Sequence, residues 1–141
     1  MPSRLAAVPA WAWLGGIVVA SFGLRAWLGR SMVAPFVMVD ELVYSELAKS
    51  LADNGSYAVR GLAASGYSLL YPLLIAPAYG LPERLTDAYA AAKVIGALSM
   101  SLAAVPAYLV ARRVAGMWLA LLAAVLSVAL PSLAYTGTIT T

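Results

Sequence analysis

The sequence predicts an all-helical integral membrane protein with three or four transmembrane helices. Of its 141 residues, 63% are hydrophobic and only 11% are charged. The apolar runs are too long for the core elements of a small soluble domain, and a water-soluble fold of this size would leave much apolar surface exposed. We therefore expect the bilayer to be the solvent of this chain.

The charged and reactive residues narrow the possible functions. The net charge is +3, but the basic residues are scattered, and Arg112-Arg113 is the only adjacent pair. Scattered basic residues are more typical of signals that set the membrane topology than of a nucleic-acid binding surface, so we expect no nucleic-acid partner. The sequence has no Cys and no His, which excludes a thiolate nucleophile, a disulfide, an imidazole base and a conventional zinc site. The groups that remain for catalysis or ligand binding are carboxylates, Lys, Arg, Tyr, hydroxyl groups and the backbone.

Residues 5–28 are predicted to form the first transmembrane helix. The range 5–24 carries no charge and is as long as the roughly 20 residues that a spanning helix needs. Trp11, Trp13 and Trp27 lie towards the two ends of this helix, where indole rings prefer the headgroup zone and keep their N–H groups in contact with water.

Residues 29–66 follow as an extracytoplasmic loop that is too polar to cross a membrane. Within it, residues 41–54 are predicted to form an amphipathic juxtamembrane helix that lies flat on the membrane surface. Asp40 is placed for an N-cap and Asn54-Gly55 for a left-handed stop. The apolar residues of this helix recur at helical spacing and are Val43, Tyr44, Leu47, Ala48 and Leu51.

Three apolar segments make up the rest of the chain. Residues 67–81 are short for a span and are interrupted by two prolines, so they form either a re-entrant or a transmembrane segment. Residues 88–111 are predicted to cross as a helix that Pro106 kinks, and residues 116–136 are predicted to cross as well.

The basic residues select between two topologies. If 67–81 crosses fully and the N-terminus is inside, Arg112-Arg113 lies outside. If 67–81 is re-entrant or interfacial, Arg4 and Arg112-Arg113 share the inside, and the acidic loop faces outside. We favour the second arrangement, because a tight basic turn is a stronger signal than charges diluted over a long loop. The expected location is the cytoplasmic (inner) membrane, with a multi-pass topology.

Asp40 and Glu41 are adjacent carboxylates just after the first predicted span, and they allow two interpretations. In the structural one, Asp40 caps the following helix and Glu41 compensates its dipole, which together contribute about 1 to 2 kcal/mol. In the functional one, the pair accepts a proton from an incoming hydroxyl group or holds a divalent cation bound to phosphate.

Three stretches together resemble the start of GT-C type membrane glycosyltransferases: "VDELVYSELAKSLADNGSY", "YSLLYPLLIAPAYGL" and "AKVIGALSMSLAAVPAYLVARRVAG". The likeness is to the protein O-mannosyltransferase and aminoarabinose transferase branch, which uses sugars carried on polyprenyl phosphates. The first extracytoplasmic loop of that branch reads Asp-Glu, Tyr three residues later, Ala, Gly and an aromatic-Pro pair. The matching positions are Asp40, Glu41, Tyr44, Ala48, Gly55 and Tyr71-Pro72.

The resemblance implies a transferase whose site faces outwards, with Asp40 as the general base and Glu41 beside it. The donor would be a polyprenyl-phosphate-linked sugar, and Arg60 and Lys93 would bind its phosphate. Tyr44 and Tyr71 would be further substrate-binding positions. The alternatives are headgroup anchoring for Arg60, snorkelling for Lys93 and interface or kink roles for the tyrosine-proline stretch. Whether the acidic pair holds Mg²⁺ or Mn²⁺ stays open.

Enzymes of this type are several times longer and have more transmembrane helices, so the chain is expected to be the N-terminal module of a longer enzyme, inactive alone. Its partners would be membrane lipid, the lipid-linked sugar and further transmembrane helices, from the same enzyme or another subunit. One alternative is a small non-catalytic protein that binds or flips a lipid-linked sugar and resembles GtrA-type flippase subunits. Another is a structural membrane subunit that packs through the small residues of 88–111.

Overall fold

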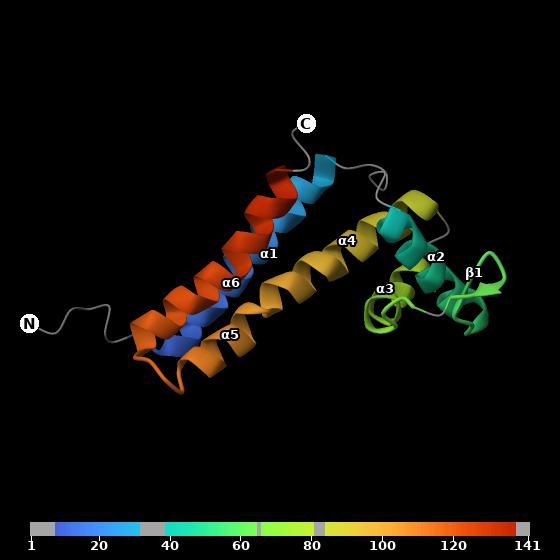
Figure 1. Cartoon of the computed structure of the whole chain (residues 1–141). Coiled ribbons are helices and arrows are strands. Elements are labelled where there is room, and N and C mark those ends of the chain that lie inside the picture. Colours follow the sequence, from blue (N-terminus) through green and yellow to red (C-terminus); the bar gives the residue numbers. More distant parts are fainter. Residues whose placement is uncertain (1–7, 32–38, 65, 81–83, 138–141) are drawn as a thin grey trace, which may run out of the picture. The chain divides into compact units, whose positions relative to one another are not determined.

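The computed structural model of the protein describes residues 8–31, 39–64, 66–80 and 84–137, although the side chains of 31, 39–41, 85 and 131–137 lie outside that description (Figure 1). Most of these residues are helical, as predicted. Among them, two helical stretches are long and apolar enough to cross a membrane, Ala10–Leu28 and Thr86–Ala111. The chain divides into two compact units, which are described separately: Met1–Trp27 with Ala97–Thr141, and Leu28–Gly96.

The first unit contains α1 (Ala10–Leu28), the end of α4 (Leu85–Leu102), α5 (Ala104–Ala111) and α6 (Met117–Gly137). Its core is made largely of small residues on α5 and α6, which allow helix backbones to approach closely. The buried residues are Ala104, Tyr108, Ala120, Leu121, Ala124 and Val128, and α1 packs against them. Figure 1 shows α1 and α6 running side by side.

The helix α1 begins at Ala10, later than the predicted start at residue 5. Residues 5–7 lie outside the described residues, but Val8 and Pro9 are described and are not helical. A proline disfavours helical backbone in the residue before it, which explains why the helix begins after Pro9. The N–H of Ala12 donates to the carbonyl of Pro9 at 2.9 Å in the first turn.

The tryptophans of α1 differ in their environments. Trp11 and Trp27 are 75% and 65% exposed, which fits the predicted interface positions. Trp13 instead packs edge-on against Trp118, with ring centroids 6.2 Å apart. Its Nε1 is buried and has no hydrogen-bond partner among the described residues. The prediction of a wet N–H is therefore wrong for Trp13, because the other helices of the unit cover it.

Pro106 breaks the long helical stretch as predicted. The helix α4 ends at Leu102 and α5 begins at Ala104. Pro106 has no N–H to donate to the carbonyl of Leu102, and its ring collides with that carbonyl. The break therefore falls one turn before the proline. The turn at Arg112-Arg113 leads into α6, which covers the predicted segment 116–136.

The second unit contains α2 (Val39–Asn54), a two-stranded hairpin, α3 (Leu70–Gly80) and the start of α4. The short 3-10 turn η2 (Gly29–Ser31) precedes α2. In this unit α2 packs against α3: Leu47 and Ala48 are fully buried, and Ile75 is 2% exposed. Part of the apolar face of α2 is therefore covered by protein, while Val43, Tyr44 and Leu51 are only half-buried; that this helix lies on the membrane surface stays a prediction.

The hairpin was not predicted. Strands β1 (Ala58–Val59) and β2 (Leu62–Ala63) pair antiparallel, with Ala58 opposite Ala63 and Val59 opposite Leu62. Arg60 and Gly61 form the two-residue turn, and their φ angles of 51° and 82° are both positive. Positive φ at both positions is typical of a type I′ turn. The predicted loop 29–66 therefore contains a small two-stranded sheet, whereas the other regular elements of the described residues are helices.

Gly55 ends α2 as predicted, and it provides a test of the helix stop. Its φ is +64°, and its N–H donates to the carbonyl of Leu51 at 3.0 Å. Gly55→Ala should lower the free energy of unfolding by about 1 kcal/mol, because an L side chain is disfavoured in this conformation. Thermal unfolding in detergent measures the effect.

Gly16→Ala is the control for this change. Gly16 lies inside α1, and a Cβ added there meets no atom within 4 Å. Alanine is a better helix former than glycine, so the same chemical change should leave stability unchanged or raise it. A loss of equal size at both glycines would contradict the role of Gly55 as a left-handed stop.

Candidate functional site

The acidic pair lies at the beginning of α2. Asp40 and Glu41 are in the first turn, because the helix begins at Val39 and not at the predicted Glu41. Asp40 is therefore the second residue of the helix and does not occupy the predicted N-cap position; the side chains of both residues lie outside the described part of the chain. Position alone places the pair at the end of a helix that is held on α3 by buried contacts one to two turns further on.

Tyr44 is the centre of an aromatic cluster one turn after the acidic pair. Its ring meets Tyr67 at 5.9 Å and Tyr71 at 5.5 Å between centroids, both edge to face. Tyr67 and Tyr71 are 40% and 41% exposed. The Tyr71 hydroxyl reaches α4, because a Cβ added at Gly96 would lie 3.6 Å from it. The two tyrosines predicted to bind substrate are therefore in contact with each other.

Tyr57 supports this cluster from the start of the hairpin. Its hydroxyl donates to the carbonyl of Tyr67 at 3.0 Å. Desolvation, and to a lesser degree the nearby Tyr44, raises the pKa of Tyr57 above its ordinary value. The phenol therefore stays protonated, and remains a donor, across the physiological pH range.

Arg60 lies at the tip of the hairpin, beside a polar hollow of about 150 Å³. Acidic and basic side chains both line this hollow, which is formed by α2 and the hairpin: Glu46, Lys49, Ser50, Asp53, Asn54, Ala58, Arg60 and Gly61. The left-handed conformation of Arg60 is uncommon for a side chain of this size and costs about 1 kcal/mol or more. The turn nonetheless projects a cation from the tip of the loop.

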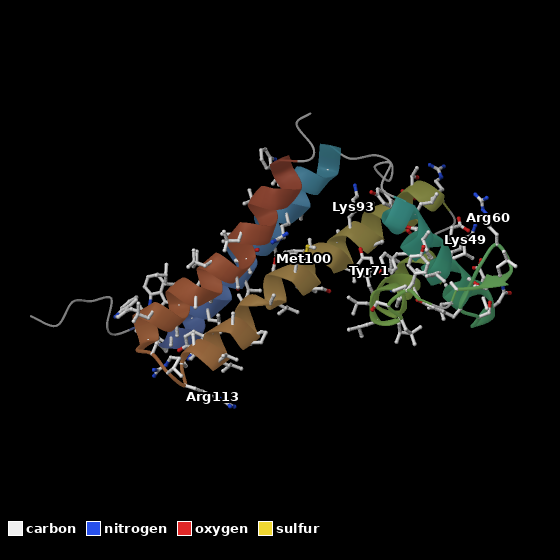
Figure 2. The ribbon with its side chains drawn as sticks, in the orientation of Figure 1. Lys49, Arg60, Tyr71, Lys93, Met100 and Arg113 are labelled. Atoms are coloured by element: carbon white, nitrogen blue, oxygen red, sulfur yellow. The ribbon has the colours of Figure 1, made fainter. Side chains whose placement is uncertain are left out.

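Lys93 has a different environment. Its Nζ donates to the carbonyl of Gly29 at 2.7 Å and lies 5.0 Å from the centroid of the Tyr89 ring. The lysine therefore holds the chain just after α1 and is partly covered by an aromatic ring. Figure 2 shows Lys93 on α4 and Arg60 at the hairpin, well apart. The two predicted phosphate ligands do not form one cationic cluster.

No group of three or more acidic side chains that could hold a metal ion occurs in the part of the chain that the structure describes. The side chains of Asp40 and Glu41 lie outside that part, so the open question of Mg²⁺ or Mn²⁺ at this pair is unaffected.

Arg25 is a polar centre of the first unit that the sequence analysis did not single out. From α1 it donates to the carbonyl of Val128 on α6 at 2.8 Å, to Met100 Sδ on α4 at 3.3 Å and to Ser21 Oγ at 3.3 Å. Ser21 Oγ lies 3.0 Å from Ser101 Oγ, which also bonds the carbonyl of Ala97 at 2.7 Å. One hydroxyl proton serves one acceptor, so Ser101 donates to Ala97 and Ser21 donates to Ser101.

The hydrogen bonds of Arg25 are weak compared with the cost of burying its charge in a membrane. An interhelical hydrogen bond within a membrane contributes about 0.6 kcal/mol on average, whereas an arginine at the centre of a span costs about 2.5 to 3.5 kcal/mol. Only two of the bonds of Arg25 join different helices, and at about 0.6 kcal/mol each they are worth less than that cost, so net stability does not account for its presence. The signal available in the sequence was a charge inside the predicted span 5–28, one turn after Ser21.

Comparison with protein-family models, with curated proteins and with solved structures gives no match. The glycosyltransferase resemblance accordingly rests on the residues of this chain. What the fold establishes is a mostly helical protein with two helices long and apolar enough for membrane association.

Proposed function

We propose that the chain is the first module of a glycosyltransferase that moves a sugar from a polyprenyl-phosphate carrier to a hydroxyl acceptor at the outer face of the cytoplasmic membrane. In this proposal α1, the α4–α5 stretch and α6 cross the membrane, whereas α2 and α3 do not cross it and belong to its outer side. The basic turn Arg112-Arg113 then lies inside, in agreement with the positive-inside rule.

The observation that carries the proposal is that the positions of the sequence resemblance meet in one compact unit. Asp40 and Glu41 begin α2, and Tyr44 contacts Tyr71 at 5.5 Å between centroids. Ala48 is fully buried against the α3 side. The remaining positions also have structural roles, because Gly55 ends α2 and Pro72 is fully buried.

The proposed reaction assigns one step to each kind of group. The acceptor hydroxyl oxygen attacks the anomeric carbon of the sugar while Asp40 takes the hydroxyl proton. The bond between that carbon and the phosphate oxygen breaks, and the polyprenyl phosphate leaves with the electron pair. Cations near the departing phosphate stabilise its charge. Arg60 is the better candidate for this role, because Lys93 is bonded to the backbone of Gly29.

Carrier binding tests the proposal. The protein in nanodiscs should bind a polyprenyl phosphate and should bind the uncharged polyprenol at least tenfold more weakly. Arg60→Gln should weaken polyprenyl-phosphate binding about tenfold, because a charge-assisted hydrogen bond contributes about 1.5 to 3 kcal/mol. Native mass spectrometry of the protein with each lipid measures both.

Arg113→Gln is the matched control, since it removes the same charge from an exposed side chain in the α5–α6 turn. It should leave binding unchanged. Equal binding of polyprenol and polyprenyl phosphate would contradict the proposal, as would an equal loss in the two arginine variants.

A further inference from the structure

The helix α3 has two apolar faces, and only one of them is covered. Pro72, Ile75, Ala76 and Ala78 are buried within the unit. On the other side four leucines are exposed: Leu69 by 52%, Leu70 by 74%, Leu73 by 55% and Leu74 by 42%. Leu69 directly precedes the helix and the other three lie in its N-terminal part, where their spacing joins them into one patch, here called the leucine face. A helix that is apolar all round is normally buried on all sides, so the leucine face requires an apolar neighbour.

The length of α3 points to what that neighbour is. The helix has 11 residues and is therefore about 16 Å long, about half of the ~30 Å hydrocarbon thickness of a bilayer. No charged residue occurs from residue 67 to residue 81. The helix is apolar enough to enter the hydrocarbon and too short to cross it.

The rest of the unit gives α3 an orientation relative to water. The half-exposed rings of Tyr67 and Tyr71 lie at its N-terminal end, and such rings favour the headgroup zone. Beyond α2 lie the exposed side chains of Lys49, Asp53 and Arg60. Polarity thus rises from the leucine face through α3 and α2 to the charged hollow.

We infer that α3 is embedded in one leaflet of the bilayer without crossing it, with its leucine face in the hydrocarbon and α2 held above it at headgroup depth. This deepens the proposed function and rests on it only for the choice of the outer leaflet. Packed helices lie about 8 to 10 Å apart, so α2 would bring Asp40 and Glu41 to the depth of a carrier phosphate. The polyprenyl chain would then lie in the hydrocarbon beside α3.

Single cysteines test the inference directly, because the natural chain contains none. Leu70→Cys and Leu62→Cys are a matched pair: Leu70 is 74% exposed on α3 and Leu62 is 76% exposed on the hairpin. Each is spin-labelled in liposomes, and collisions with oxygen and with a water-soluble nickel complex are compared. We expect position 70 to be accessible to oxygen and protected from nickel, and position 62 to show the reverse. Leu73→Cys repeats the measurement should Leu70→Cys fail to fold.

Two results would overturn the inference. Nickel accessibility at position 70 equal to that at position 62 would place the leucine face in water, and protection from both reagents would mean that protein covers it. Ser68→Cys and Arg84→Cys, which flank α3, should react with an impermeant thiol reagent from the same side. Reaction from opposite sides would show that the segment crosses. These readouts report membrane contact alone, so they can succeed even if the carrier-binding experiment fails.

Discussion

Replacing Asp40 by Asn in the whole proposed glycosyltransferase should lower sugar transfer at least a hundredfold while the protein still folds and inserts. Asparagine has nearly the same shape as aspartate but cannot take the hydroxyl proton, and a general base contributes about 10² to 10⁴ in rate. Asparagine is also favoured near helix N-termini, so the stability of α2 should change little. In cells whose only copy carries the substitution, a polyprenyl-phosphate sugar should accumulate. Mass spectrometry of extracted lipids measures it without knowledge of the sugar.

Asp53→Asn is the control for this prediction, because Asp53 is an exposed carboxylate near the other end of α2. It should leave the lipid pool unchanged. If Asp40→Asn leaves the lipid pool unchanged while the chain still binds polyprenyl phosphate, the catalytic assignment fails. The non-catalytic interpretation, a protein that binds or flips a lipid-linked sugar, then explains the data better.

Ala48→Leu should have the second large effect, on stability and on transfer together. Ala48 is 0% exposed and belongs to the buried cluster that joins α2 to α3, with Ile75, Ala76 and Ala92. The added methyl groups have no space there, and overpacking a core typically costs about 1 to 3 kcal/mol. Relief of the clash would move α2 away from α3 and displace the acidic pair. Thermal unfolding and the lipid-linked sugar pool measure the two effects.

Ala90→Leu adds the same side chain at an exposed position of α4 in the same unit. Its effect on unfolding should be within about 0.5 kcal/mol, as for most surface substitutions. Equal effects at positions 48 and 90 would show that α2 is not held through this contact, and the structural explanation of the resemblance would lose its support.

The features that could be predicted are those encoded locally. Chain chemistry fixes the break before Pro106 and the stop at Gly55, because a missing N–H and a left-handed backbone act within one turn. Apolar length alone located the stretches that became α1, α3, α6 and the α4–α5 pair. The start of α1 was predicted too early because the apolar run begins before Pro9. The proline prevents helical backbone there, but it does not lower the hydropathy of the segment.

The features that could not be predicted depend on contacts between distant residues. An apolar face on α2 has the same sequence pattern whether lipid or another helix covers it, so periodicity could not reveal that α3 is its neighbour. The hairpin escaped because each strand has two residues, and an Arg-Gly turn lacks the Asn-Gly or Asp-Gly signature of such turns. The role of Arg25 was not predicted because two of its acceptors lie on other helices that are distant in the sequence.

The helical stretch Thr86–Ala111 has a consequence for the membranes that suit this protein. As one straight helix its 26 residues would rise about 39 Å, about 9 Å more than the ~30 Å hydrocarbon core, so the interruption between α4 and α5 falls in a stretch that is longer than a span needs. If the stretch crosses the membrane as proposed, Arg112 and Arg113 keep the end that they follow in water, and the surplus falls at the end that carries Asp87. A markedly thicker bilayer would draw this carboxylate towards the acyl chains. The surplus therefore lets the stretch suit a somewhat thicker bilayer until Asp87 reaches the acyl chains, whereas a thinner bilayer would increase the hydrophobic mismatch.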